Sequence, residues 1–113
     1  MTTADLTILI EQMRSASQHA RSYCDGLNKA DFLADEKTQD AVAMKIIVIG
    51  EIATKLIEKH SDFISRNAHI PWRSIKGMRN RIAHGYFEID QEVVWETVQQ
   101  LSLLEAGLAQ LQF

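Results

Sequence analysis

Apolar side chains recur at three- and four-residue steps along most of this 113-residue chain, and few residues interrupt the pattern. This spacing is the signature of amphipathic helices. Five glycines and one proline leave few points at which a helix must break. The sequence therefore predicts an all-α fold, an antiparallel bundle of about four to five helices formed by one domain of residues 1–113.

Residues that can cap a helix stand before most of the predicted helices. Asn28 and Asp31 have the spacing of a capping box, and Asp90 precedes the last apolar stripe. Pro71 suits the first turn of a shorter helix, which we expect Gly85 to stop. The expected segments are residues 6–27, capped by Thr2 or Thr3, a short turn after 28, 35–58, 71–83 and 90–111.

Composition narrows the function classes. The chain is 46% hydrophobic and 24% charged, which is typical of a soluble globular domain. A single cysteine, Cys24, excludes an internal disulfide framework. The longest apolar run, residues 46–50, is far shorter than the roughly 20 residues that cross a membrane. The first residues do not show the basic region, apolar run and small-residue cleavage site of a signal peptide. We therefore expect a cytoplasmic protein without a membrane partner.

Charge is distributed unevenly along the chain. Residues 63–87 contain no Asp or Glu, whereas the other 88 residues hold seven basic and fifteen acidic side chains, a net charge of −8. A compact basic patch on an acidic body can bind an anion such as RNA. A solvated basic helix end explains the same charge, and on charge alone it is the better interpretation. The basic residues of the window are Arg66, Arg73, Lys76, Arg79 and Arg81.

The stretch "RNRIAHGY", residues 79–86, carries the candidate chemistry. Histidine exchanges a proton near neutral pH and arginine binds phosphate oxygens, so Arg79 and His84 suit RNA cleavage through the 2′-OH. On one straight helix the two side chains diverge by about 140°. They face one substrate if Gly85 redirects the chain after His84, or if two copies meet across a two-fold axis.

Other residues near this stretch have two interpretations each. Arg73, Lys76 and Arg81 bind RNA backbone or are only solvated charge. Glu51 lies on the most apolar helix, which we expect its neighbours to enclose. It should therefore meet an arginine, with Arg81 a candidate, or a backbone donor. Its role is then structural or supports a catalytic group. The four histidines show no paired metal-ligand spacing, so no metal or cofactor is expected.

Residues 70–98 and the preceding "DAVAMKIIVIGEIATKL" closely resemble the HepT-like branch of the HEPN superfamily. Its members are helical toxins encoded beside a minimal nucleotidyltransferase antitoxin. The marker of that branch is Arg-x4-His-x-Tyr with a polar residue after the arginine. In this chain the marker reads Arg79, Asn80, His84 and Tyr86, without a departure.

The resemblance implies a homodimeric, metal-independent endoribonuclease toxin of a type VII-like toxin–antitoxin pair. Arg79 and His84 would be catalytic at the dimer interface, and Asn80 would support the site. Tyr86 would accept AMP from the nucleotidyltransferase, which neutralises the toxin. We expect Tyr86 to be exposed and Phe87 to anchor the following loop.

Two other functions remain open. The alternative from a different class is a non-catalytic HEPN dimer that binds or scaffolds a nucleotidyltransferase. A third possibility is the substrate-binding subunit of a larger nucleotidyltransferase, which would bind ATP or a small nucleotide, but no glycine-rich phosphate loop or acidic metal pair supports it.

Overall fold

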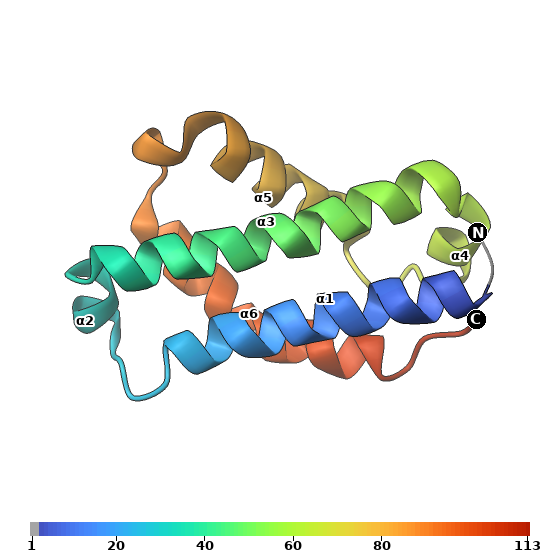
Figure 1. The fold of residues 1–113 in the computed structure, drawn as a ribbon, viewed down its shortest axis with the longest axis horizontal. Helices are drawn as coiled ribbons and strands as arrows, with labels where there is room; N and C mark the ends of the chain where they lie inside the picture. Colours follow the sequence, from blue (N-terminus) through green and yellow to red (C-terminus); the bar gives the residue numbers. More distant parts are fainter. Residues whose placement is uncertain (1–2) are drawn as a thin grey trace.

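The structure is a computed structural model that describes the backbone of residues 3–113 and their side chains apart from residues 3, 4 and 86. Within that range the chain forms six α-helices and one 3₁₀ turn, with no strand (Figure 1). The elements are α1 (Thr3–Tyr23), α2 (Lys29–Leu33), α3 (Glu36–Lys59), α4 (Ser61–Arg66), α5 (Trp72–Gly85), η1 (Tyr86–Glu88) and α6 (Gln91–Leu108). The predicted all-α bundle is confirmed.

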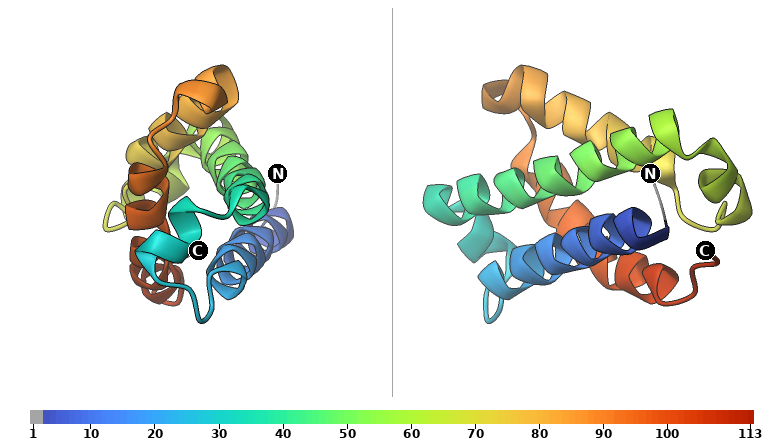
Figure 2. Two further views of the ribbon diagram at one scale, coloured as in Figure 1. Left: turned by 90° about the vertical axis from the view of Figure 1, so that its left-hand side faces the viewer. Right: turned by 45° about the vertical axis from the view of Figure 1, so that its right-hand side comes forward.

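Helix α3 is the central element, because it packs against each of the other five α-helices. Helices α1 and α5 run antiparallel to it on two sides (Figure 1). Viewed along the bundle, α1 and α3 form one side and α6 the other, with α5 above them (Figure 2). The core between them holds fully buried side chains from every α-helix, among them Met13, Phe32, Leu56, Phe63, Ile82 and Val94.

Side-chain caps begin three of the helices, and two of them, at Asn28 and Asp90, were predicted. Asn28 and Asp31 form a reciprocal capping box at α2, and the Asp90 carboxylate accepts a hydrogen bond from the Glu92 backbone N–H at 2.9 Å. Asp35 caps α3, accepting from both the hydroxyl and the backbone N–H of Thr38. These two bonds lower the pKa of Asp35 below its usual value. The cap expected at residue 2 or 3 lies outside the described residues and side chains.

One helix was missing from the prediction. Helix α4 begins two residues after α3 ends, and its C-cap, Asn67, is fully buried. The Asn67 side chain donates to Phe63 O and Gln112 O at 2.9 Å each and accepts from Gln112 N at 2.7 Å. Trp72 Nε1 donates to Asn67 O at 3.0 Å. Asn67 thus joins α4 and the C-terminal residues to the first residue of α5.

Helix α5 ends at Gly85, as predicted, but the alternative in which Gly85 redirects the chain does not occur in the structure. The chain continues from Gly85 directly into η1. Gly85 does not have a positive φ; among the described residues that conformation occurs at Gly26, with φ of 77°. A glycine ends a helix sharply when it takes the left-handed conformation, and Gly85 does not. Arg79 and His84 therefore lie on one continuous helix.

Helices α3 and α5 approach each other closely at Gly50. A Cβ atom built on Gly50 would lie 2.8 Å from Arg79 Cγ, 3.3 Å from Arg79 Cα and closer still to Arg79 Cβ. Real Cβ contacts are essentially never that short. Gly50 is buried, so the space that its missing side chain leaves is filled by the stem of the arginine.

We predict that Gly50→Ala lowers the free energy of unfolding. The clash with Arg79 should cost about 1–3 kcal/mol, as overpacking does, and should outweigh the gain in helix propensity of about 1 kcal/mol. Urea unfolding followed by circular dichroism measures the change.

Gly77→Ala is the matched control, because it makes the same substitution inside α5. A Cβ at Gly77 meets nothing within 4 Å. Gly77→Ala should therefore stabilise the chain by about 0.5–1 kcal/mol. A Gly50→Ala variant as stable as Gly77→Ala would contradict the close approach of α3 and α5.

Candidate active site

Arg79 lies on the inward face of α5. At 100° per residue, Trp72, Ile75 and Ile82 all lie within about 60° of it around the helix. Trp72 and Ile82 are buried and Ile75 is half-buried. An arginine on this face would clash with a neighbouring helix that carried a side chain opposite it. Gly50 removes that obstacle, so the arginine stem packs on α3 and 17% of its side chain stays exposed.

The guanidinium of Arg79 is held from two sides. Its Nε lies 2.8 Å from Glu51 Oε1 on α3, and its Nη1 donates a short hydrogen bond to Asn80 Oδ1 on α5. The buried Nε–H has no aligned acceptor, so the contact with Glu51 is an ion pair rather than a hydrogen bond. Together the two contacts fix the orientation of the guanidinium group across the α3–α5 junction.

Glu51 differs from its prediction in two respects. It is not enclosed, because 57% of its side chain is exposed. Its partner is Arg79 and not Arg81, which is exposed on another side of α5. The expectation that Glu51 meets an arginine is confirmed. An ion pair this exposed contributes about 1 kcal/mol or less to stability, so its main effect is to orient the guanidinium.

His84 is exposed in the last turn of α5. It shares one side of the helix with Arg73 and Asn80, since the three Cα directions fall within about 40° of one another. Arg79 itself points about 140° away from His84. Asn80 nevertheless accepts from Arg79 Nη1, so one end of the long arginine side chain contacts a residue of the His84 side.

The remaining basic candidates also lie on α5. Arg73 and Arg81 are exposed and Lys76 is half-buried. Lys76 lies about 60° from Arg79 around the helix, whereas Arg81 lies about 160° away. Helix α5 therefore carries basic side chains on several sides, and Arg73 is the one that shares a side with His84.

The turn after α5 contains the residue expected to be modified. The side chain of Tyr86 lies outside the described side chains; its backbone opens η1. Phe87 follows it and is 88% exposed. The prediction that Phe87 anchors the loop before α6 is therefore wrong. Half-buried Ile89 packs against the core two residues later instead.

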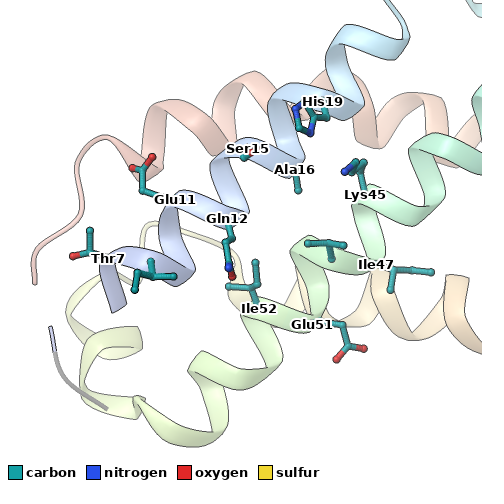
Figure 3. Close-up of a pocket in the computed structure, with 12 residues that line it drawn as sticks. Thr7, Glu11, Gln12, Ser15, Ala16, His19, Lys45, Ile47, Glu51 and Ile52 are labelled. Atoms are coloured by element: carbon teal, nitrogen blue, oxygen red, sulfur yellow. The ribbon is translucent and has the colours of Figure 1, made fainter. Parts of the chain in front are cut away.

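A groove of about 760 Å³ runs between α1 and α3 and includes Glu51 in its lining (Figure 3). Its surface is mostly apolar. On α3 the stripe Met44, Ile47, Val48 and Glu51 follows helical spacing and faces outward; Met44 is 58% exposed and Ile47 and Val48 are half-buried. Figure 3 shows Glu51 projecting from α3 away from α1. The apolar surface thus ends at the residue that contacts Arg79.

Sequence reasoning missed Gly50. The signal was a lone glycine at the end of the most apolar run, directly before the carboxylate that holds Arg79. A glycine inside a helical pattern indicates a close approach of another backbone or side chain.

Metal and thiol chemistry find little support in the described residues. Within residues 3–113 no group of three or more His, Cys, Asp or Glu side chains is arranged to hold a metal ion. Burial, followed by the charges of Asp25 and Asp35, raises the pKa of the Cys24 thiol. It therefore stays protonated near neutral pH and is a poor nucleophile.

No helix within residues 3–113 is both long and apolar enough to span a bilayer.

Curated relatives are named as ribonucleases. A protein of Thermococcus cleftensis named "Probable ribonuclease HepT" is 44% identical over 70 residues, which are 62% of this chain and 61% of that protein. A Methanocaldococcus jannaschii protein named "Putative RNase" is 40% identical over 68 residues, 60% of this chain and 54% of that protein. The matches thus span less than two thirds of either relative. No solved structure matches at a significant level.

A family profile covers more of the chain than these pairwise matches. The profile described as "Ribonuclease HepT-like" matches residues 13–111, which include Gly50, Glu51 and the whole of α5. The resemblance seen in the residues 79–86 motif is thereby confirmed at the level of the family. This chain belongs to the HepT-like ribonuclease family.

Proposed function

We propose that this protein is a metal-independent endoribonuclease toxin of a type VII-like toxin–antitoxin pair, with Arg79 and His84 as its catalytic residues. The observation that carries the proposal is the fixed guanidinium of Arg79. Glu51 and Asn80 hold it in one orientation at the α3–α5 junction. Fixed donors of this kind stabilise a transition-state charge without first having to reorganise.

The chemistry needs only the RNA and these side chains. The 2′-oxygen attacks the adjacent phosphorus, the bond to the 5′-oxygen breaks, and a 2′,3′-cyclic phosphate forms. His84 takes the 2′-OH proton or gives a proton to the leaving 5′-oxygen. Arg79 binds the phosphorane oxygens on which negative charge gathers. Arg73, Lys76 and Arg81 attract the flanking phosphates.

A second copy of the chain completes the site. Because α5 continues past His84, one helix alone directs Arg79 and His84 to different sides, and a two-fold partner supplies the missing group. The apolar α1–α3 groove is the surface that this homodimer uses, since it ends at Glu51 beside Arg79. In a dimer formed there, both arginines lie next to the interface.

The ribonuclease activity is regulated through modification of Tyr86. A cognate minimal nucleotidyltransferase transfers AMP to its hydroxyl, and the added phosphate then occupies the basic site by charge and bulk. The protein acts in the cytoplasm as a single domain. The alternative is a non-catalytic dimer that scaffolds the nucleotidyltransferase; the fixed arginine favours catalysis, because a scaffold has no need of it.

We predict that purified chain cleaves RNA in EDTA and that the two catalytic variants do not. His84→Ala should lower the rate about 100-fold or more, as loss of a general acid–base does. Arg79→Lys should lower it about 100-fold. Lysine keeps the stem that packs on Gly50 but loses the fork. Gel analysis of labelled RNA measures both rates.

Arg14→Ala and His69→Ala are the controls, because they remove the same side-chain types from α1 and from the loop before α5. Both should cleave at the wild-type rate. Cleavage by His84→Ala and Arg79→Lys at that same rate would show that the catalytic assignment is wrong.

We predict that Ile47→Asp converts the chain from dimer to monomer and abolishes cleavage, since it places a carboxylate in the apolar groove. Light scattering measures the mass of the particle. Leu103→Asp, at a 72% exposed position on α6, is the matched control and should stay dimeric. An unchanged mass for Ile47→Asp would place the interface elsewhere.

We predict that incubation with the nucleotidyltransferase and ATP raises the intact mass by whole AMP units and stops cleavage. Tyr86→Phe should show no rise, because phenylalanine lacks the accepting hydroxyl. Mass spectrometry of the intact chain measures the change. An equal rise in Tyr86→Phe would assign the acceptor to another residue.

A further inference from the structure

The turn between α5 and α6 presents an apolar surface to solvent. Phe87 has the largest exposed fraction, 88%, among the large apolar side chains of the described residues. A single exposed apolar side chain is common and indicates nothing by itself. Here, however, Phe87 lines a depression of about 490 Å³ together with Leu33, which is 38% exposed, and Ile89. We call these three residues, with Glu36 and Asp40 at the rim, the Phe87 surface.

The rim of this surface carries the carboxylates of Glu36 and Asp40. The end of the bundle around it is also acidic, because residues 29–40 and 88–92, which span α2, the start of α3, the last residue of η1 and the start of α6, contain seven carboxylates and two lysines. Lys29 is already paired with Glu92 at 3.6 Å. The left view of Figure 2 faces this end of the bundle. RNA is repelled from such a surface, whereas a protein with a basic contact patch is attracted to it.

The Phe87 surface also adjoins the backbone of residue 86, which opens the same 3₁₀ turn. An enzyme that modifies residue 86 has to contact what surrounds it. We propose that the Phe87 surface is the docking site of the nucleotidyltransferase, which binds it through a basic patch with an apolar centre. This inference rests on the proposed function, since it takes residue 86 as the acceptor.

The arrangement separates the two partners by charge. RNA is drawn to the basic side chains of α5, and the nucleotidyltransferase to the acidic end one turn beyond them. Phe87 supplies the apolar contact, because an aromatic side chain that becomes fully buried contributes strongly to an interface. The carboxylates supply attraction and exclude the wrong partner.

The test uses the full chain and the purified nucleotidyltransferase of the neighbouring gene. Binding is measured without ATP, so that docking is observed apart from AMP transfer. Phe87→Ala should weaken the Kd about tenfold or more, as removal of a central aromatic contact does. The double variant Glu36→Lys, Glu88→Lys should also bind more weakly, and its Kd should change less with added salt than that of wild type.

Matched controls share the chemistry but lie elsewhere. Leu103→Ala truncates another exposed apolar side chain, and Glu58→Lys reverses an exposed charge near the far end of α3. Both should bind as wild type does. All four variants should cleave RNA at the wild-type rate, which shows that they are folded.

The outcomes separate the two proposals. Equal binding by wild type and Phe87→Ala overturns the docking site, even if AMP transfer to Tyr86 occurs. The docking site is also overturned if Phe87→Ala, measured without the nucleotidyltransferase, has a smaller particle mass than wild type, because the surface then joins copies of this chain. If wild type gains no AMP, or Tyr86→Phe gains as much, the proposed regulation fails, while the binding measurement still decides the docking site.

Discussion

The contact between Gly50 and Arg79 is the constraint on which the rest of the site depends. The inward face of α5 otherwise carries Trp72 and Ile82, which belong to the core. An arginine can share that face only because α3 has no side chain opposite it. Its stem then packs as a core residue does, and its guanidinium extends along α3 to Glu51. Packing on Gly50 therefore fixes the stem of the arginine, and Glu51 and Asn80 orient the charged guanidinium.

The molecule presents three surfaces of different chemistry. Helix α5 presents basic side chains, the α1–α3 groove is mostly apolar, and the end formed by α2 and the start of α6 is acidic. Each suits a different class of partner: a polyanion, a second copy of the chain, and a basic protein. If the proposed partners bind as we propose, they would not compete for one surface of this 113-residue chain.

Local chemistry determined which parts of the fold could be predicted. The long helices follow from periodicity, and the caps at Asn28, Asp35 and Asp90 follow from side chains bonding two or three residues away. Helix α4 has six residues, too few to show a period, and Asn67 at its end bonds to residues 45 positions later. No short window of sequence contains that information.

The candidate site shows the same limit. The motif of residues 79–86 made Arg79 and His84 the candidate catalytic residues. The cost of an unpaired carboxylate predicted an arginine partner for Glu51. Which arginine it would be depends on how α3 and α5 are rotated against each other, and Gly50 sets that rotation. Phe87 was misassigned because an aromatic residue in a loop has the same local pattern whether it faces the core or another molecule.

The unbroken passage from α5 into η1 bears on how such a chain is switched off. No left-handed residue intervenes, so the backbone of residue 86 follows His84 within one continuous stretch of helix and 3₁₀ turn. A group attached at residue 86 would remain beside the histidine without any relay through the core. Inhibition of this kind acts by occupancy and needs no second conformation of the fold. On the proposed function, the cell would then adjust the total activity through the fraction of molecules that is modified.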